Sequence, residues 1–215
     1  MAGILDLLNS DIGRQIIGGV SQETKQPADK TAQVVSMALP LLMGAMKRNA
    51  ATPEGAQGLL GALNNSKHDG SMLDNLSGLF GGGVNEEVKQ DGLGILGHVL
   101  GGSQNNVVSA LSNKSGVDTD SVMKILTVIA PIVLQYLGKQ KRNQQVETPS
   151  GLEGLLGGML GGERKTQAKQ QSLIESLLDG DGDGSIVDDI AGMVLSGGKK
   201  KGGIGGMLGG LFGGR

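Results

Sequence analysis

Apolar residues recur every three or four positions along most of the first 160 residues, which predicts a series of α-helices. The longest run covers residues 118–142, and Asp118 at its start is a favourable helix N-cap. A second long helix is expected from about Pro27 to Arg48, because proline suits the first turn and cations suit the last. Shorter helices are expected within residues 4–17, in two pieces with Ser10 or Asp11 as the N-cap between them, and over 53–65, 72–80, 85–102 and 105–112. Residues 64–71 are expected to form a loop, and the pattern as a whole predicts an all-α fold.

Each of the two long predicted helices carries a proline in its interior, Pro40 in one and Pro131 in the other. An interior proline removes one backbone hydrogen bond, so a kink is expected at each position. Such a kink can shape a binding cleft, but more often it lets a helix wrap around its core. The second interpretation is favoured for both helices.

The two long helices belong to a longer internal similarity. Shifted by 91 positions, residues 4–46 align without a gap on residues 95–137, and Pro40 falls on Pro131. Further on, a Thr-Pro pair followed by Gly-Leu-Leu-Gly occurs at 52–61 and again at 148–157. We interpret this as a duplication of two helical subunits, residues 1–65 and 86–162, each built on a proline-kinked core helix. The two would pack as one α domain or as two α lobes.

Three further segments complete the expected organisation. Residues 66–85 form a linker with a short helix, and residues 163–195 read as a helix, an Asp-Gly loop and a second helix. Residues 196–215 are a low-complexity Gly/Lys tail, whose composition favours disorder. The alternative is a docking peptide for a protein partner or for self-association. Its apolar residues would be Ile204, Met207, Leu208, Leu211 and Phe212.

The Asp-Gly loop has the spacing of a calcium-binding loop. Its proposed ligands, at positions 1, 3, 5, 7 and 11, are Asp179, Asp181, Asp183, Ser185 and Asp189. Alternate residues of a tight loop can point oxygens at one hard cation. The loop departs from an EF-hand at position 12, which is Ile190, so Asp189 rather than Asp188 is expected to supply the last carboxylate. A solvated acidic turn that caps the next helix is the alternative, with Mg²⁺ or no ion in place of Ca²⁺.

The composition argues against several kinds of site and partner. The 40 glycines and only three aromatic residues indicate a modest core, and the absence of cysteine excludes disulfides and thiolate metal sites. A net charge of −2 gives no electrostatic case for nucleic acid as a partner. No transmembrane segment is expected, because the most apolar window, residues 125–137, is shorter than the roughly 20 residues that span a bilayer. A soluble, cytoplasmic protein is expected.

No catalytic motif stands out. His68 lies in a predicted loop and His98 on a predicted helix, and neither has further ligands at metal-binding spacing, so no zinc site is assigned. The glycine-rich residues 161–166 lack the spacing and the preceding strand of a phosphate-binding loop. No Gly-x-Ser-x-Gly nucleophile motif occurs. We therefore expect a protein that is not an enzyme.

Three stretches carry a resemblance to a known family. DGLGILGHVLGG at 91–102 and SGVDTDSVMKILTVIAPIVLQYLGKQ at 115–140 resemble the bacterial domain-of-unknown-function family 937, also called YidB-like. DGDGDGSIVDDIAGM at 179–193 is similar to the Asp-rich close of its members. The resemblance implies an all-α fold and a bacterial source. It implies no activity, so no catalytic residue is carried over.

The expected function is that of a non-enzymatic helical structural or interaction protein with one structural divalent-cation loop. The alternative is a small-ligand-binding protein or an enzyme whose cleft lies between the duplicated subunits. Membrane-peripheral attachment through residues 199–212 is a weaker third hypothesis, because the glycines leave no long amphipathic face.

Overall fold

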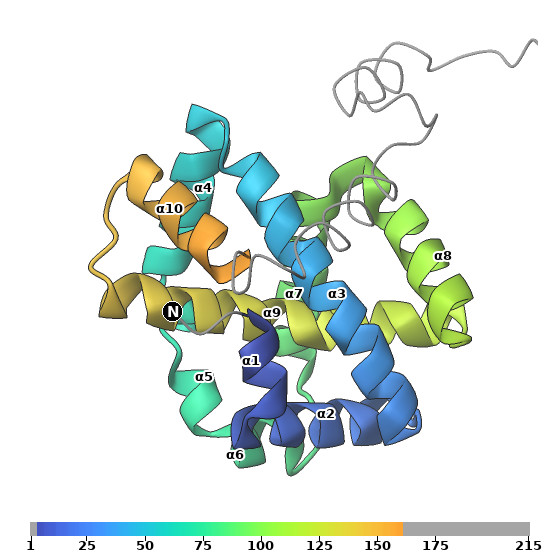
Figure 1. Cartoon of the computed structure of the whole chain (residues 1–215). Helices are drawn as coiled ribbons and strands as arrows, with labels where there is room; N and C mark the ends of the chain where they lie inside the picture. The colour runs from blue at the N-terminus through green and yellow to red at the C-terminus, as the bar shows by residue number, and fades with distance from the viewer. Residues whose placement is uncertain (1–3, 161–215) are drawn as a thin grey trace, which may run out of the picture.

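The fold is known from a computed structural model that describes residues 4–160, and this part of the chain is helical without a strand (Figure 1). The α-helices are α1 (Ile4–Asn9), α2 (Asp11–Thr24), α3 (Ala28–Asn49), α4 (Pro53–Asn64), α5 (Ser71–Asp74), α6 (Leu76–Phe80), α7 (Glu86–Leu100), α8 (Gln104–Ser115), α9 (Thr119–Asn143) and α10 (Pro149–Leu160). Two 3₁₀ turns, η1 (Ser66–His68) and η2 (Gly101–Ser103), complete the order. The predicted all-α class is confirmed.

Local capping explains where the helices begin. The side chains of Ser10, Thr52, Asn85 and Asp118 each accept a hydrogen bond from a backbone N–H three residues ahead, at 2.8–3.2 Å. Each bond satisfies one of the backbone donors that a helix leaves unpaired at its start. The bond from the Ser121 N–H also lowers the pKa of the Asp118 carboxyl. The predicted N-caps of α2 and α9 are confirmed at Ser10 and Asp118.

The linker differs from the expectation in two places. The helix expected over residues 72–80 is broken at Asn75, which separates α5 from α6. The Asn75 side chain accepts a hydrogen bond from the Gly78 N–H at 3.1 Å, and asparagine competes in this way with the helical backbone. The loop expected over residues 64–71 contains the 3₁₀ turn η1, which carries His68. This turn matters below because it closes one end of the site.

Two long helices, α3 and α9, cross at the centre of the molecule (Figure 1). Helices α2, α4, α7, α8 and α10 all pack against one or both of them. The buried apolar residues, from Ile4 in α1 to Met159 in α10, form a single core. Both helices continue through their interior prolines, Pro40 and Pro131, without a break.

Judged by length and composition alone, helix α9 could cross a membrane, because the mean hydropathy of its most apolar 18-residue window is 1.6. With 25 residues, α9 is longer than the apolar run of residues 125–137 on which the expectation of no transmembrane segment was based. However, 83% of that window is buried inside the fold, as in the core helix of a soluble protein.

Helices α7 and α9 approach each other most closely at a proline. Pro131 has no N–H, so the carbonyl of Thr127, four residues earlier, loses its helical partner. Gly92 of α7 lies directly over this carbonyl, and a Cβ atom at Gly92 would lie only 1.9 Å from the Thr127 oxygen. Because glycine has only a hydrogen in that place, the two backbones can touch here. The glycine and the proline together fix the position of α7 on α9.

An ion pair joins α7 to α2 and to the end of the linker. The Glu23 carboxylate lies 2.8 Å from the Lys89 ammonium and accepts a hydrogen bond from the Val84 N–H at 2.9 Å. The Lys89 bond, and then the Val84 bond, lower the pKa of Glu23. Only 17% of the Glu23 side chain is exposed, so this contact fixes the start of α7.

Replacing Gly92 by alanine should destabilise the fold by about 1–3 kcal/mol or more, because the new methyl group would overlap the Thr127 carbonyl. The matched control is Gly94→Ala, two residues along the same helix, where a Cβ would have no atom within 4 Å. That change should be neutral or should stabilise α7 by up to about 1 kcal/mol through helix propensity. Urea unfolding of both variants measures the difference, and equal stabilities would contradict the close approach.

Candidate functional site

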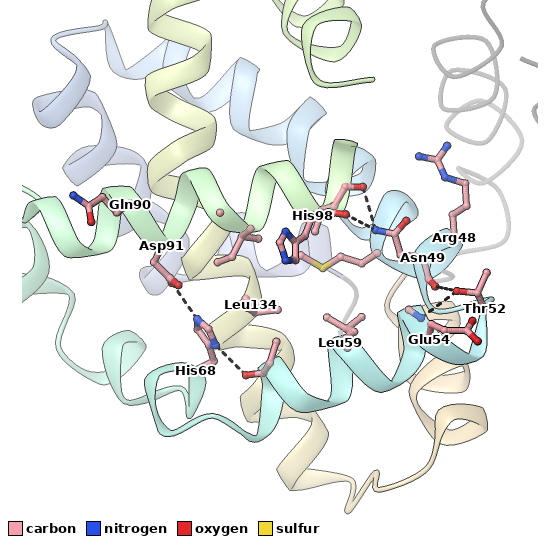
Figure 2. A pocket seen from close by; sticks show the side chains of 17 residues that line it. Arg48, Asn49, Thr52, Glu54, Leu59, His68, Gln90, Asp91, His98 and Leu134 are labelled. Carbon is pink, nitrogen blue, oxygen red and sulfur yellow. Dashed lines mark hydrogen bonds and ion pairs between the residues drawn. The ribbon is translucent and has the colours of Figure 1, made fainter. Parts of the chain in front are cut away.

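A cavity of about 790 Å³ lies between α4 and α7, and we call it the α4–α7 groove (Figure 2). Both helices pack on α9, and side chains of α3 and α9 form the bottom of the groove. Its apolar lining consists of Met46, Leu59, Ala62, Ile95, Val99 and Leu134. Ligand pockets in proteins have volumes of roughly 300–1,000 Å³ and a mostly apolar lining with a few polar groups. The α4–α7 groove therefore has the size and lining of a binding site.

Each wall of the groove carries a glycine that no packing contact requires, although a third lining glycine, Gly55, lies against the Asn49 carbonyl. Gly58 of α4 and Gly94 of α7 both line it, and a Cβ at either position would have no atom within 4 Å. Two glycines of other helix contacts differ, since a Cβ at Gly92 or Gly138 would lie about 2 Å from a backbone oxygen, whereas Gly61 and Gly97, outside the groove, are open like Gly58 and Gly94. Each helical glycine costs about 1 kcal/mol relative to alanine. The groove glycines therefore leave open space at the level of the backbone.

A buried histidine closes one end of the groove. The His68 ring lies between the Ala62 carbonyl, 2.9 Å from Nδ1, and the Asp91 carboxylate, 3.0 Å from Nε2 (Figure 2). Only 8% of its side chain is exposed. Each ring nitrogen thus has an oxygen atom within hydrogen-bond distance inside the fold. This pair joins the end of α4 to α7 across the groove.

Gln135 of α9 holds the turn that carries His68. Its side chain is 1% exposed, accepts a hydrogen bond from the Gly70 N–H and donates one to the Lys67 carbonyl. Gly138, one turn further along α9, lets the His68 backbone approach closely. Hydrogen bonds from Ser71, first from its side chain and then from its N–H, lower the pKa of Asp69 in the same loop. The position of His68 is thus set by a buried amide far away in the sequence.

The opposite end of the groove joins α3 to α7. The Asn49 side-chain amide donates to the carbonyls of His98 and Val99, at 2.9 and 3.3 Å, and so caps the last turn of α7. Arg48 and Glu54 lie at this end, away from His68 (Figure 2). The His98 ring lies between the two ends and is exposed to solvent. Apart from His98, the polar groups described here lie at the ends of the groove, and its middle is mainly apolar.

Sequence patterns alone did not connect His68 with His98, yet both residues line the α4–α7 groove. The signal that could have linked them is weak: Asp91 lies on the same predicted helix as His98 and is its only acidic neighbour near the middle of that helix. The predicted cation ligands, from Asp179 to Asp189, lie outside the described residues. Within residues 4–160, no three histidine, aspartate or glutamate side chains are grouped in a way that could hold a metal ion.

Comparison with protein families gives one match. A family described as bacterial protein of unknown function, domain-of-unknown-function family 937, matches residues 6–140 and 143–215. The chain belongs to this family. Searches of curated proteins and of solved structures found no significant match. Membership agrees with the all-α helices and assigns no activity to the groove.

Replacing Asp91 by alanine should destabilise the protein by about 1–3 kcal/mol, because the His68 Nε2–H would lose its acceptor while buried. The matched control is Gln90→Ala, its exposed neighbour on α7, which should change the free energy of unfolding by less than about 0.5 kcal/mol. Thermal or urea unfolding measures both. An unfolding free energy for Asp91→Ala equal to that of the control would contradict the buried pair.

Proposed function

We propose that this protein is a non-enzymatic interaction module whose α4–α7 groove binds an apolar helical segment of a polypeptide. The observation that carries the proposal is the pair of glycines, Gly58 and Gly94, that line opposite walls of an apolar groove with open space above each. An amphipathic helix that lays its apolar face into a hydrophobic groove is a common mode of peptide recognition.

The fold itself supports a helix as the occupant. Gly92 permits α7 to touch the backbone of α9, and Gly94 lies half a turn further along the same helix. A second helix with small residues on its face could approach Gly94 as closely as α9 approaches Gly92. Leu59, Ala62 and Ile95, each only partly buried, would supply the apolar contact.

The polar groups of the groove favour binding over catalysis. The Asn49 amide caps α7, the Thr52 hydroxyl caps α4, and His68 and Asp91 satisfy each other. A catalytic nucleophile needs a free base within hydrogen-bond reach. His98 has an exposed ring and no hydroxyl or thiol nucleophile bonded to it among the described residues. Small-ligand binding in the same groove is the alternative, and it is an outcome of the test below.

An internal duplication explains why the groove lies where it does, and three local features support it. At an offset of 91, Lys25 and Gly116 both end a helix in the left-handed conformation, with φ of 55° and 69°. At the same offset, the hydroxyls of Thr24 and Ser115 both donate to the carbonyl four residues earlier at 2.7 Å. The two matched Thr-Pro pairs, at an offset of 96, both open a helix with the threonine bonded to a glycine N–H.

The helix packing has the same regularity. The matched pairs are α2 with α8, α3 with α9, and α4 with α10. Helix α2 packs on α9 and α8 packs on α3, while α4 packs on α9 and α10 packs on α3. Each of these four short helices therefore packs on the long helix of the other subunit as well as on that of its own. The groove has α4 of the first subunit and α7 of the second as its walls, so it lies between the two.

A groove-filling variant tests the binding proposal. The probe is a synthetic amphipathic peptide with leucines at helical spacing and glycines between them, titrated into the full-length protein and followed by NMR shift mapping on α4 and α7. Gly94→Leu should weaken binding at least tenfold, about 1.4 kcal/mol, because the new side chain enters the groove.

The matched control is Gly61→Leu, which adds the same side chain at an open glycine of α4 that does not line the groove. It should leave the affinity unchanged. Shift changes outside α4 and α7, or equal binding by both variants, would contradict the proposal. Binding of a small apolar molecule such as a medium-chain fatty acid, without peptide binding, would favour the small-ligand alternative.

The predicted cation loop is a separate proposal that rests on the sequence. We expect Ca²⁺ to give a calorimetric binding signal and to raise the melting temperature, because Asp179, Asp181 and Asp183 have the ligand spacing of a calcium loop. Asp181→Ala should abolish both effects. Asp188→Ala, which removes an acid not assigned as a ligand, should retain them. Absence of heat with Ca²⁺ and with Mg²⁺ would contradict the loop.

A further inference from the structure

A short sequence occurs at the ends of two helices, α7 and α10, and recurs near the C-terminus. Residues 157–162 and 205–210 are both GGMLGG, preceded by Leu156 in one case and Ile204 in the other. Residues 96–102 of α7 and η2 are a looser copy, LGHVLGG. The shared pattern is an apolar residue, a glycine, any residue, a valine or methionine, a leucine and two glycines. We call it the closing motif.

The two closing motifs within the described residues pack their apolar positions inward. In α7 these positions are Leu96, Val99 and Leu100, which are 0%, 7% and 3% exposed. In α10, Leu156 and Met159 are 0% and 2% exposed, and Leu160 packs against the same core. In both cases the apolar positions of the motif lie in the last turns of a helix, at 96–100 of α7 and 156–160 of α10, that packs against another helix. The equivalent positions of the third copy are Ile204, Met207 and Leu208.

We propose that the third closing motif, within residues 204–212, is the chain's own ligand for the α4–α7 groove and binds there in cis. Its apolar positions match those that the first two copies bury, and Leu211 and Phe212 extend the same face by one turn. Its glycines match the demand of the groove, where Gly58 and Gly94 leave room for a backbone. As a helix, the segment would be apolar with small residues, which is the occupant that the proposed function requires.

The length of the chain permits this contact. There are 43 residues between Leu160 and Ile204. Even at the helical rise of 1.5 Å per residue they would span roughly 65 Å, against a radius of gyration of about 15 Å for a domain of this size. A tethered segment reaches effective concentrations in the millimolar range, which favours the segment of the same chain over that of a second copy.

Paramagnetic NMR on the full-length protein tests the proposal. The chain has no cysteine, so Gly213→Cys gives a unique site for a nitroxide label. The label should broaden the amide signals of Leu59, Ala62 and Ile95 on the groove walls. Adding Leu208→Asp to the labelled chain should remove the broadening, and so should Gly94→Leu, while Gly61→Leu should leave it. Broadening elsewhere, or none, would overturn the proposal.

A mixture experiment separates the two sources of the segment. Isotope-labelled protein without a nitroxide is mixed with unlabelled protein that carries one. Binding in cis predicts no broadening of the isotope-labelled signals in the mixture, and broadening there would show binding between copies and overturn the cis arrangement.

This inference rests on the proposed function, and the added peptide distinguishes their failures. If the segment occupies the groove, Leu208→Asp should tighten binding of the synthetic peptide severalfold, because a competitor has been removed. Peptide binding that is sensitive to Gly94→Leu but unchanged by Leu208→Asp would refute the cis ligand and retain the groove. If the peptide does not bind at all while the nitroxide still broadens the groove signals, the groove is specific for its own tail and the general interaction module fails.

Discussion

The contact between α7 and α9 at Gly92 and Pro131 is the constraint on which the rest of the arrangement depends. Pro131 frees the Thr127 carbonyl, and Gly92 has no side chain to keep α7 away from it. Helix α7 therefore lies at backbone distance from α9. Helix α4 also packs on α9, but the polar contacts to α7 at the two ends of the groove come from its neighbours: His68 of η1 pairs with Asp91, and Asn49 at the end of α3 caps α7.

The groove follows from this unequal packing. The α7 wall is pressed against α9. The two ends of the groove are closed by polar groups that are hydrogen-bonded to other groups of the fold. Between those ends the lining is apolar side chains and bare glycines, apart from the exposed His98 ring. A groove of this kind offers area and close approach but few directed polar contacts, which suits an apolar helix better than a reaction centre.

Helices and their ends could be predicted with little error, because they depend on residues within about four positions of each other. Ser10 and Asp118, the predicted N-caps of α2 and α9, were both informative in this local way. The break at Asn75 was missed because an asparagine side chain either caps or interrupts a helix, and the apolar spacing does not distinguish these. The residues of the candidate site were not predicted as a set, since His68, Asp91 and Gln135 lie on three elements that meet only after packing.

Gly92 and Gly94 show where the information in the sequence ends. They lie two residues apart in one glycine-weakened helix, and both interrupt the same apolar pattern. The sequence by itself determined that this segment is a helix and that it is locally costly. Only the tertiary structure decided that a Cβ at one glycine would strike a carbonyl while a Cβ at the other would meet open space. The physical reason is that a residue's neighbours on the next helix depend on how the helices pack, which local spacing does not encode.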